Sequence, residues 1–237
     1  MIYSFDSRVR YSELGEDGKM TLNAMINYLQ DCSTFQSEDI GKGIEYLRER
    51  GRAWLLNSWQ IQIARRAELN ERISVGTWSY GYKSMYGYRN FVITDSEGEY
   101  LLKANSVWVL YDLEKKRPVK VTDEDLKGYV TCERLDMDYS ERKLVIPETR
   151  ERKEAFPVRR YQIDTNGHVN NGQYIRVAQE CIPEEFVVSG LCAEYRKSAV
   201  YGDTFYPEVA KTAEGYAVAL NDEEGKPFAV VAFSGKA

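Results

Sequence analysis

The chain carries the same order of sequence features twice, and this repetition restricts its fold more than any other property. Matching residues recur 149 positions apart. They are Val9-Arg10 with Val158-Arg159, Gly18 with Gly167, Ile26 with Ile175, and Gln30-Asp31-Cys32 with Gln179-Glu180-Cys181. Two later matches, Arg65-Arg66 with Arg196-Lys197 and 95–98 with 222–225, have smaller offsets because the second copy has shorter connections. Two copies at so long a period indicate a duplicated domain rather than chance similarity between two α+β domains.

Each copy combines one strand, one long helix and a run of further strands. In the first copy, residues 3–11 alternate as in a strand, and a helix begins at Thr21 as N-cap and ends by Gly41 or Gly43. Its apolar face consists of Leu22, Met25, Ile26, Leu29 and Cys32. We expect a short helix at 44–50 and strands at 54–66, 72–82, 86–95 and 99–112, with a hairpin at 95–98. This order predicts a sheet wrapped around a helix, which is the hotdog plan.

The predicted fold is α+β, a tandem double hotdog with two curved antiparallel sheets, each wrapped around a long helix. We expect an N-terminal hotdog unit at 1–125, a linker at 126–154 and a C-terminal hotdog unit at 155–237. The segment 114–154 is rich in charged residues and shows little periodicity, apart from one short helix at 123–127. Hotdog units pair, so a duplicated chain can supply both members, and a homodimer of such chains is a further option.

Composition excludes several classes of protein. The net charge of −5 argues against nucleic-acid binding. The four cysteines form no C-x-x-C pair, so we expect free thiols and a reducing, cytoplasmic location. No apolar signal core and no run of about 18 apolar residues occur, so neither secretion nor a membrane span is expected. The single histidine, His168, and the scattered cysteines argue against a metal site, and no nucleotide-binding motif suggests a cofactor.

One segment in the second copy concentrates the residues that could carry chemistry. Asp164, Asn166 and the intervening residues favour a turn, and His168 ends it. Asn170 or Asn171 can cap the helix that follows. If the backbone is extended, the side chains at 164, 166 and 168 point to one side, beside the N–H groups of the helix N-terminus. Such N–H groups can stabilise a developing oxyanion.

The segment 161–175, YQIDTNGHVNNGQYI, resembles the D-x-N-x-H-x-N-N-x-x-Y segment of the acyl-ACP (acyl carrier protein) thioesterases of plants and bacteria. The order of the first helix, Trp54 and Trp59, the central hairpin and 193–196 also fits this family. The resemblance implies hydrolysis of fatty acyl-ACP to free fatty acid and ACP, with water as co-substrate and no cofactor. It also implies an acyl carrier protein bearing an acylated phosphopantetheine as partner.

The resemblance assigns roles residue by residue. Asp164 is expected to act as base or nucleophile, Asn166 to orient the carboxylate or the carbonyl, and His168 to assist by hydrogen bonding and proton transfer, which suits an imidazole near neutral pH. Which of Asp164 and His168 activates water stays open. A lone turn histidine is ordinarily exposed or capping, and Asp and Asn are ordinary turn formers, but the full motif in a duplicated fold favours catalysis.

Substrate contacts are expected from a second set of residues. They are Asn170, Asn171, Ser198, Trp54, Trp59 and Met25. The last three have the character of core residues, but the resemblance implies an acyl tunnel along the first unit's helix that they could also line. Plant members carry a Glu-Cys pair where this chain has Ser198 and Ala199. This departure argues against a cysteine-based mechanism, although Ser198 could still bind a water.

Three other readings of the site remain. The chain could be an acyl-CoA thioesterase or a hydroxyacyl dehydratase of hotdog fold, or a non-catalytic acyl-binding module. The joint presence of Asp164 and His168 argues against the last of these. The basic pairs Arg65-Arg66, Arg159-Arg160 and Arg196-Lys197 are ordinarily solvated strand ends, but they could form a patch that receives the acidic carrier protein.

Overall fold

The computed structural model describes residues 2–236, which divide into two compact units. Among the described residues, unit 1 comprises 2–57 and 63–139, and unit 2 comprises 58–62 and 140–236. The predicted boundaries at 1–125, 126–154 and 155–237 stay a prediction, because these units are defined by contacts and not by independent folding. No helix within 2–236 is long and apolar enough to cross a membrane.

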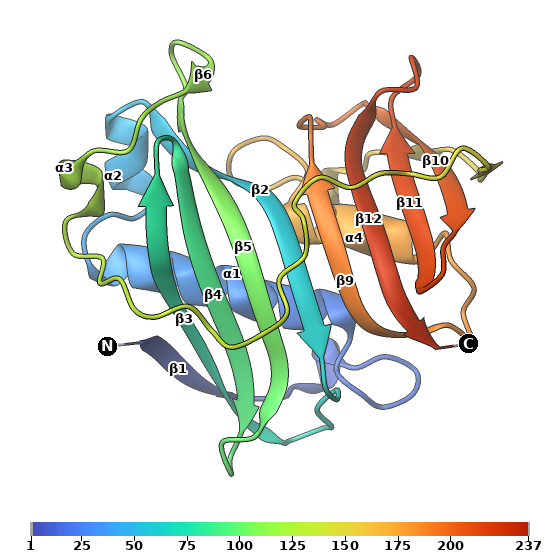
Figure 1. Ribbon diagram of the computed structural model, residues 1–237, viewed down its shortest axis with the longest axis horizontal. Coiled ribbons are helices and arrows are strands. Elements are labelled where there is room, and N and C mark those ends of the chain that lie inside the picture. Colours follow the sequence, from blue (N-terminus) through green and yellow to red (C-terminus); the bar gives the residue numbers. More distant parts are fainter. Residues whose placement is uncertain (1, 237) are drawn as a thin grey trace. The chain divides into compact units, whose positions relative to one another are not determined.

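Unit 1 is an antiparallel sheet with one long helix against it (Figure 1). Its elements are β1 (Tyr3–Arg8), α1 (Leu22–Asp39), α2 (Ile44–Glu49), β2 (Arg52–Ile63), β3 (Arg72–Lys83), β4 (Tyr86–Asp95), β5 (Tyr100–Asp112), β6 (Arg117–Pro118) and α3 (Asp123–Leu126). The strands follow the order β1-β3-β4-β5-β2, and β6 pairs with β5. The predicted strand 86–95 coincides with β4, and the other predicted strands agree within a few residues.

Helix α1 forms where its sequence predicts it. Thr21 is the N-cap, and its side chain accepts a hydrogen bond from the backbone N–H of Ala24 at 3.2 Å. Met25 and Leu29 are buried, and the Cys32 thiol donates to the carbonyl of Val75 on β3 at 3.4 Å. The apolar stripe therefore faces the sheet, as its helical spacing requires.

One end of the interior of unit 1 is polar and holds a buried arginine that the sequence did not single out. Arg89 on β4 donates hydrogen bonds to Gln36 of α1 and, at 3.1 Å, to Thr77 Oγ1 of β3. The ring of Tyr129 lies 5.6 Å from the guanidinium carbon. Burial lowers the pKa of Arg89, and no carboxylate within 2–236 forms an ion pair with it. Neutral dipoles alone therefore solvate this cation.

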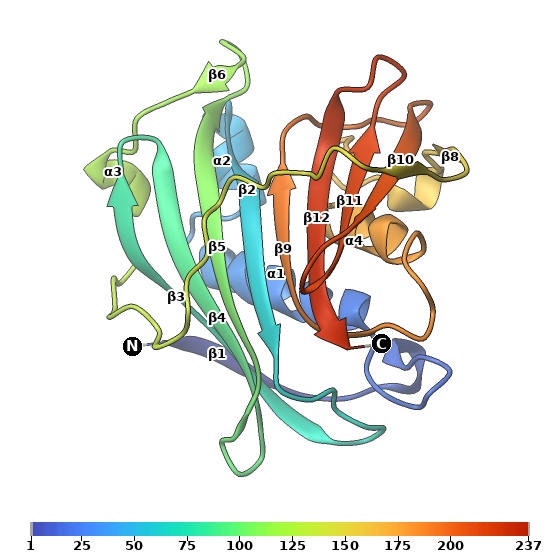
Figure 2. The ribbon, with the colours of Figure 1, turned by 45° about the vertical axis from the view of Figure 1, so that its right-hand side comes forward.

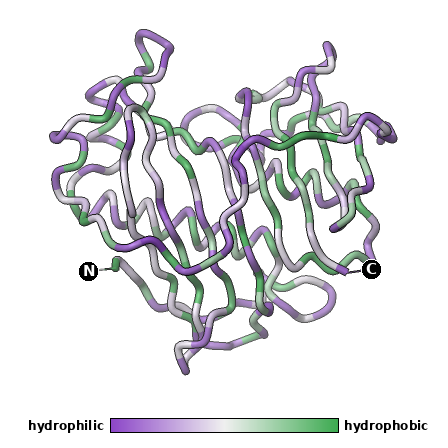
Figure 3. The backbone as a smooth tube through the Cα atoms, viewed as in Figure 1, coloured by the Kyte–Doolittle hydropathy of each residue, from purple (hydrophilic) through white to green (hydrophobic). Residues whose placement is uncertain are grey.

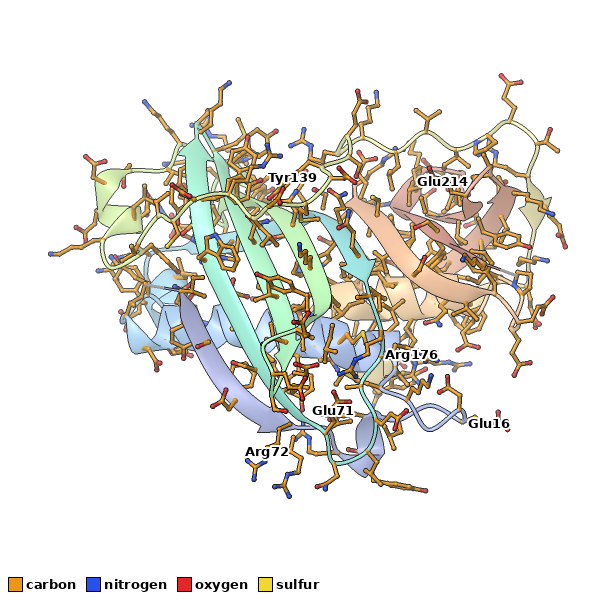
Figure 4. All side chains as sticks on the ribbon, turned by 60° about the horizontal axis from the view of Figure 1, so that its bottom comes forward. Glu16, Glu71, Arg72, Tyr139, Arg176 and Glu214 are labelled. Atoms are coloured by element: carbon orange, nitrogen blue, oxygen red, sulfur yellow. The ribbon has the colours of Figure 1, made fainter. Side chains whose placement is uncertain are left out.

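The segment that follows α3 is irregular but is held firmly against the sheet of unit 1. The indole N–H of Trp78 donates to the carbonyl of Glu133 at 2.7 Å, and the N–H of Leu135 donates to Asn90 Oδ1 at 3.1 Å. The hydroxyl of Tyr139, labelled in Figure 4, donates to the carbonyl of Leu135 at 2.9 Å. Trp78 and Asn90 of the sheet thus bind the backbone carbonyl of Glu133 and the backbone N–H of Leu135.

Unit 2 repeats the plan with a shorter helix. Its elements are β7 (Glu151–Arg152), β8 (Phe156–Pro157), the 3-10 turn η2 (Arg160–Gln162), α4 (Asn171–Gln179), β9 (Val187–Tyr195), β10 (Thr204–Lys211), β11 (Gly215–Asn221) and β12 (Pro227–Lys236). Residues 58–62 of β2 pair with β9, and the order continues β9-β12-β11-β10-β7. Helix α4 packs on β11 and β12 (Figure 2).

The hairpins at 95–98 and 222–225 have the same geometry, and both tips are hydrophilic (Figure 3). The N–H of Gly98 donates to the carbonyl of Asp95 at 3.1 Å, and that of Gly225 donates to the carbonyl of Asp222 at 3.0 Å. This predicted match is therefore confirmed. The match of Arg65-Arg66 with Arg196-Lys197 is wrong by one residue, because Arg65 pairs with Asp95 as Lys197 pairs with Asp222.

Candidate active site

The residues of the candidate site lie in a tight turn of unit 2, as the turn-forming residues predict, and the alternative of an extended backbone at 164–168 does not hold. The N–H of Asp164 donates to the carbonyl of His168 at 2.8 Å, and the N–H of Gly167 donates to the carbonyl of Asp164 at 3.0 Å. The Asp164 carboxylate accepts from the N–H groups of Asn166 at 2.8 Å and His168 at 3.4 Å. A short acidic side chain that binds nearby backbone N–H groups favours a turn over a strand.

The side chains of Asp164, Asn166 and His168 share the turn without binding one another. Asp164 and His168 are half-buried, and Asn166 is exposed. In the part of the chain that is described, no side-chain to side-chain hydrogen bond joins the three. The turn places the three residues on one short stretch of backbone, and their convergence on a substrate stays a prediction.

The two asparagines after the turn hold the start of α4. Asn170 is the N-cap, and its Oδ1 accepts from the N–H of Gly172 at 2.9 Å, as the sequence allowed. Asn171 is the first helical residue, and its carbonyl accepts a hydrogen bond from the hydroxyl of Tyr195 at 2.9 Å. Contacts of Asn170 and Asn171 with a substrate stay predictions.

Tyr174 connects α4 to the loop that follows β9, through a hydrogen bond with Ala199. Its hydroxyl accepts from the N–H of Ala199 at 2.8 Å, and the carbonyl of Ala199 accepts from the N–H of Val169 at 2.9 Å. Burial raises the pKa of Tyr174 to about 12, and the charges of Asp164 and Asp203 act in the same direction. The sequence did not single out this tyrosine, although it is the last residue of the D-x-N-x-H-x-N-N-x-x-Y segment.

The plant Glu-Cys positions offer no nucleophilic thiol here. Ser198 is exposed, and the fully buried Ala199 makes only backbone contacts with polar groups. Across residues 2–236, no three His, Cys, Asp or Glu side chains are grouped as metal ligands.

Unit 1 contains the same turn with different side chains. The N–H of Gly15 donates to the carbonyl of Lys19 at 2.9 Å, and the N–H of Gly18 donates to the carbonyl of Gly15 at 3.0 Å. Gly18 and Gly167 have nearly equal φ values of 73° and 76°. Gly15, Asp17 and Lys19 therefore stand where unit 2 has Asp164, Asn166 and His168. Because the backbone forms without those three residues, the fold does not require them.

The apolar residues predicted to contact an acyl chain are divided between the two units. Met25 in unit 1 and Trp59 in unit 2 are buried. Trp54 in unit 1 is half-buried, with its ring 6.4 Å from that of Tyr82. All three have the environment of core residues, and their contact with an acyl chain stays a prediction.

Carboxylates neutralise two of the three basic pairs but not the third. Arg65 forms ion pairs with Glu71 at 2.6 Å and Asp95 at 2.9 Å, and Arg66 pairs with Asp17. Arg196 pairs with Glu194 at 2.7 Å, and Lys197 pairs with Asp222 at 2.9 Å. Arg159 and Arg160 are exposed and have no such partner among residues 2–236.

Sequence comparison decides the affiliation of the chain. The family described as the acyl-ACP thioesterase N-terminal domain matches residues 2–129, and the acyl-ACP thioesterase C-terminal domain matches residues 146–226. The chain belongs to the acyl-ACP thioesterase family. The family indicated by the motif at 161–175 is thereby confirmed.

Two plant relatives show how low the sequence identity between this chain and other members of the family is. The palmitoyl-acyl carrier protein thioesterase, chloroplastic, of Cuphea hookeriana is 25% identical over 219 residues, which cover 83% of this chain and 52% of the relative. The oleoyl-acyl carrier protein thioesterase 1, chloroplastic, of Arabidopsis thaliana is 25% identical over 232 residues, covering 87% and 63%. The chain thus spans about half to under two thirds of the length of these relatives.

Solved structures show the same fold over the whole chain. An acyl-ACP thioesterase from Bacteroides thetaiotaomicron has a TM-score of 0.89 at 21% identity and covers 99% of this chain and 98% of its own. The 12:0-ACP thioesterase from Umbellularia californica has a TM-score of 0.87 at 18% identity and covers 99% and 97%. These members of the acyl-ACP thioesterase family support the α+β fold with antiparallel sheet and few helices.

Proposed function

We propose that this chain is a double-hotdog enzyme that hydrolyses fatty acyl-ACP thioesters to free fatty acid and ACP. Membership of the acyl-ACP thioesterase family supports the reaction class and the ACP-linked substrate. The names of the plant relatives, which act on acyl carrier protein thioesters, point to the same substrate class. A cytoplasmic location and the option of a homodimer belong to the proposal as well.

The observation that carries the proposal is the pair of equivalent turns. The turn at 15–19 and the turn at 164–168 share their backbone hydrogen bonds, but only the second contains a carboxylate, an amide and an imidazole at alternate positions. The same backbone turn forms in unit 1 without these three residues, so their joint presence in unit 2 is best explained by the chemistry that they perform. General acid–base catalysis of hydrolysis needs groups of these types.

The chemistry requires four events at the thioester. Water attacks the carbonyl carbon while Asp164 or His168 accepts its proton. A hydrogen-bond donor stabilises the oxyanion that develops, a role for which Asn166 is suited. The carbon–sulfur bond then breaks, and the proton passes to the departing phosphopantetheine thiolate. Ser198 and Ala199 provide no thiol, so the proposed route uses water directly.

A substrate panel tests this function. Wild type, Asp164→Ala and His168→Ala are supplied with acyl-ACP, acyl-CoA and hydroxyacyl thioesters of several chain lengths, and free thiol and fatty acid are measured. We expect preferential turnover of acyl-ACP and a large loss in both variants. Turnover restricted to acyl-CoA, or dehydration in place of hydrolysis, would replace the proposal with another hotdog activity. Binding without turnover would identify a non-catalytic acyl-binding module.

A further inference from the structure

The exposed surface beside the candidate turn carries two arginines without acidic partners. Arg159 and Arg160 are exposed, and no carboxylate within residues 2–236 forms an ion pair with either. The other basic pairs named above are neutralised by carboxylates. In a chain with a net charge of −5, this uncompensated positive charge is local.

The equivalent surface of unit 1 can be identified from backbone geometry. The carbonyls of Ala67 and Ala199 accept from the N–H groups of Met20 and Val169 at 2.8 and 2.9 Å. Three positions further along, Asn70 and Gly202 both have positive φ, of 68° and 100°. The loop 67–71 therefore corresponds to the loop 199–203, as the turn 15–19 corresponds to 164–168.

Unit 2 has lost four of the acidic residues that this surface has in unit 1, whereas Asp203 keeps the acid of Glu71 and Asp164 replaces Gly15. Uncharged residues replace four acids: Gln162 stands for Glu13, Thr165 for Glu16, Asn166 for Asp17 and Val200 for Glu68. In unit 1 the Glu13 carboxylate pairs with Arg10 at 2.5 Å. In unit 2 the corresponding Arg159 has only the amide oxygen of Gln162, which accepts from its backbone N–H at 2.8 Å.

Unit 2 has also gained a cation, Arg160, and two exposed tyrosines, Tyr161 and Tyr201, on this surface. Arg160 stands where unit 1 has Tyr11, and its guanidinium carbon lies 5.3 Å from the ring centre of Tyr201. Tyr161 is 75% exposed and Tyr201 is 57% exposed. Arginine and tyrosine are the residue types that most often dominate binding energy at protein interfaces.

Hydrogen bonds join this surface to the candidate turn. The N–H of Val158 donates to the carbonyl of Asp203 at 2.8 Å, and the N–H of Val169 donates to the carbonyl of Ala199 at 2.9 Å. These bonds hold the loop 199–203 beside both ends of the segment 158–169. The nearest acid of the loop, Asp203, uses its carboxylate to accept from the N–H of Val200 at 2.8 Å.

We propose that the patch formed by Arg159, Arg160, Tyr161 and Tyr201 is the surface on which the acidic carrier protein docks. The inference rests on the proposed function and adds the place of contact. An acidic partner is drawn to arginines that form no ion pair with a carboxylate of their own chain. The hydrogen-bonded frame then brings the carrier's thioester to the turn at 164–168.

The test compares charge reversals of equal size within unit 2. Arg159→Glu and Arg160→Glu each reverse one charge of the patch, and Arg160→Gln only neutralises one. Lys211→Glu makes the same reversal at an exposed residue of β10 without an ion pair. Binding of apo-ACP is measured at several salt concentrations. Hydrolysis is measured with acyl-ACP and with acyl-pantetheine, which lacks the carrier protein.

We expect the patch reversals to weaken ACP binding and raise the KM for acyl-ACP about tenfold or more, with kcat and acyl-pantetheine turnover retained. The salt dependence of binding should become shallower, and Lys211→Glu should behave as wild type. Unchanged ACP binding by Arg160→Glu, or equal weakening by Lys211→Glu, would overturn the docking surface. Wild type that binds ACP through the patch but hydrolyses neither thioester would refute the proposed function alone.

Discussion

The carboxylate of Asp164 accepts a 2.8 Å hydrogen bond from the backbone N–H of Asn166, so this candidate base also shapes its own turn. The structural role of Asp164 can be separated from its proposed chemical role, because an asparagine at this position has an amide oxygen that can accept the same hydrogen bond. Asp164→Asn should keep the turn and lose the base. We expect unchanged thermal stability and a loss of acyl-ACP turnover of about a hundredfold or more.

Two further variants serve as comparisons for Asp164→Asn. Asp164→Ala removes both roles and should lower the unfolding free energy by about 1 kcal/mol in addition to the lost turnover. Asp222 makes the same backbone contacts in its hairpin, so Asp222→Asn is the matched control and should hydrolyse normally. Full turnover by Asp164→Asn would remove the carboxylate from the mechanism.

His168 can be tested with the residue that unit 1 has in the same place. Lys19 ends an equivalent turn, so the backbone at this position accepts lysine. His168→Lys should therefore fold normally and lose turnover by about a hundredfold, because lysine cannot exchange a proton near neutral pH as an imidazole does. The reciprocal Lys19→His should leave turnover unchanged. Circular dichroism and acyl-ACP hydrolysis suffice, and a fully active His168→Lys would contradict the assignment.

Tyr174→Phe should destabilise the protein without changing its packing volume. The variant leaves the buried N–H of Ala199 without its 2.8 Å acceptor. We expect the unfolding free energy in urea to fall by about 1–3 kcal/mol. Tyr216→Phe is the control, because the ring of Tyr216 contacts Phe186 and its hydroxyl has no partner among the described residues. Equal stability of the two variants would show that the hydrogen bond contributes nothing.

The four free cysteines should differ in their reaction with iodoacetamide at pH 8. Burial raises the pKa of Cys32 to about 12 and that of Cys181 to about 11, so little of either exists as thiolate. Cys132 is partly exposed and should be labelled first. Its labelling should not reduce acyl-ACP turnover, because Ala199 occupies the plant cysteine position. Peptide mass spectrometry gives the order, and early labelling of Cys32 in the native protein would contradict it.

Features encoded by neighbouring residues could be predicted from the sequence. The cap at Thr21 and the hairpin at 95–98 depend on local turn and capping chemistry, and β4 depends on alternation and β propensity within ten residues. The irregular segment at 129–139 could not be predicted in this way. Its partners, such as Trp78 and Asn90, lie far away in the sequence and leave no periodic signal.

The composition of the candidate site and its turn were predictable, but the side-chain contacts within the turn were not. The motif located Asp164, Asn166 and His168, and the hydrogen bonds from backbone N–H groups to the Asp164 carboxylate appear only in the structure. Arg89 was missed for a different reason. A charged residue in a strand ordinarily faces solvent, whereas Gln36, Thr77 and the ring of Tyr129, all outside β4, make the burial of Arg89 tolerable.

The two equivalent turns also make the chain a starting material for enzyme engineering. Gly15 does not have the left-handed backbone that only glycine favours, and a Cβ atom there would lie 3.2 Å from Asp17 Oδ1. A triple replacement of Gly15, Asp17 and Lys19 by Asp, Asn and His keeps an oxygen atom at position 17, so that side chain has to shift by a few tenths of an ångström. The turn at 15–19 therefore offers a second position for the three side chains of the turn at 164–168, without redesign of the backbone.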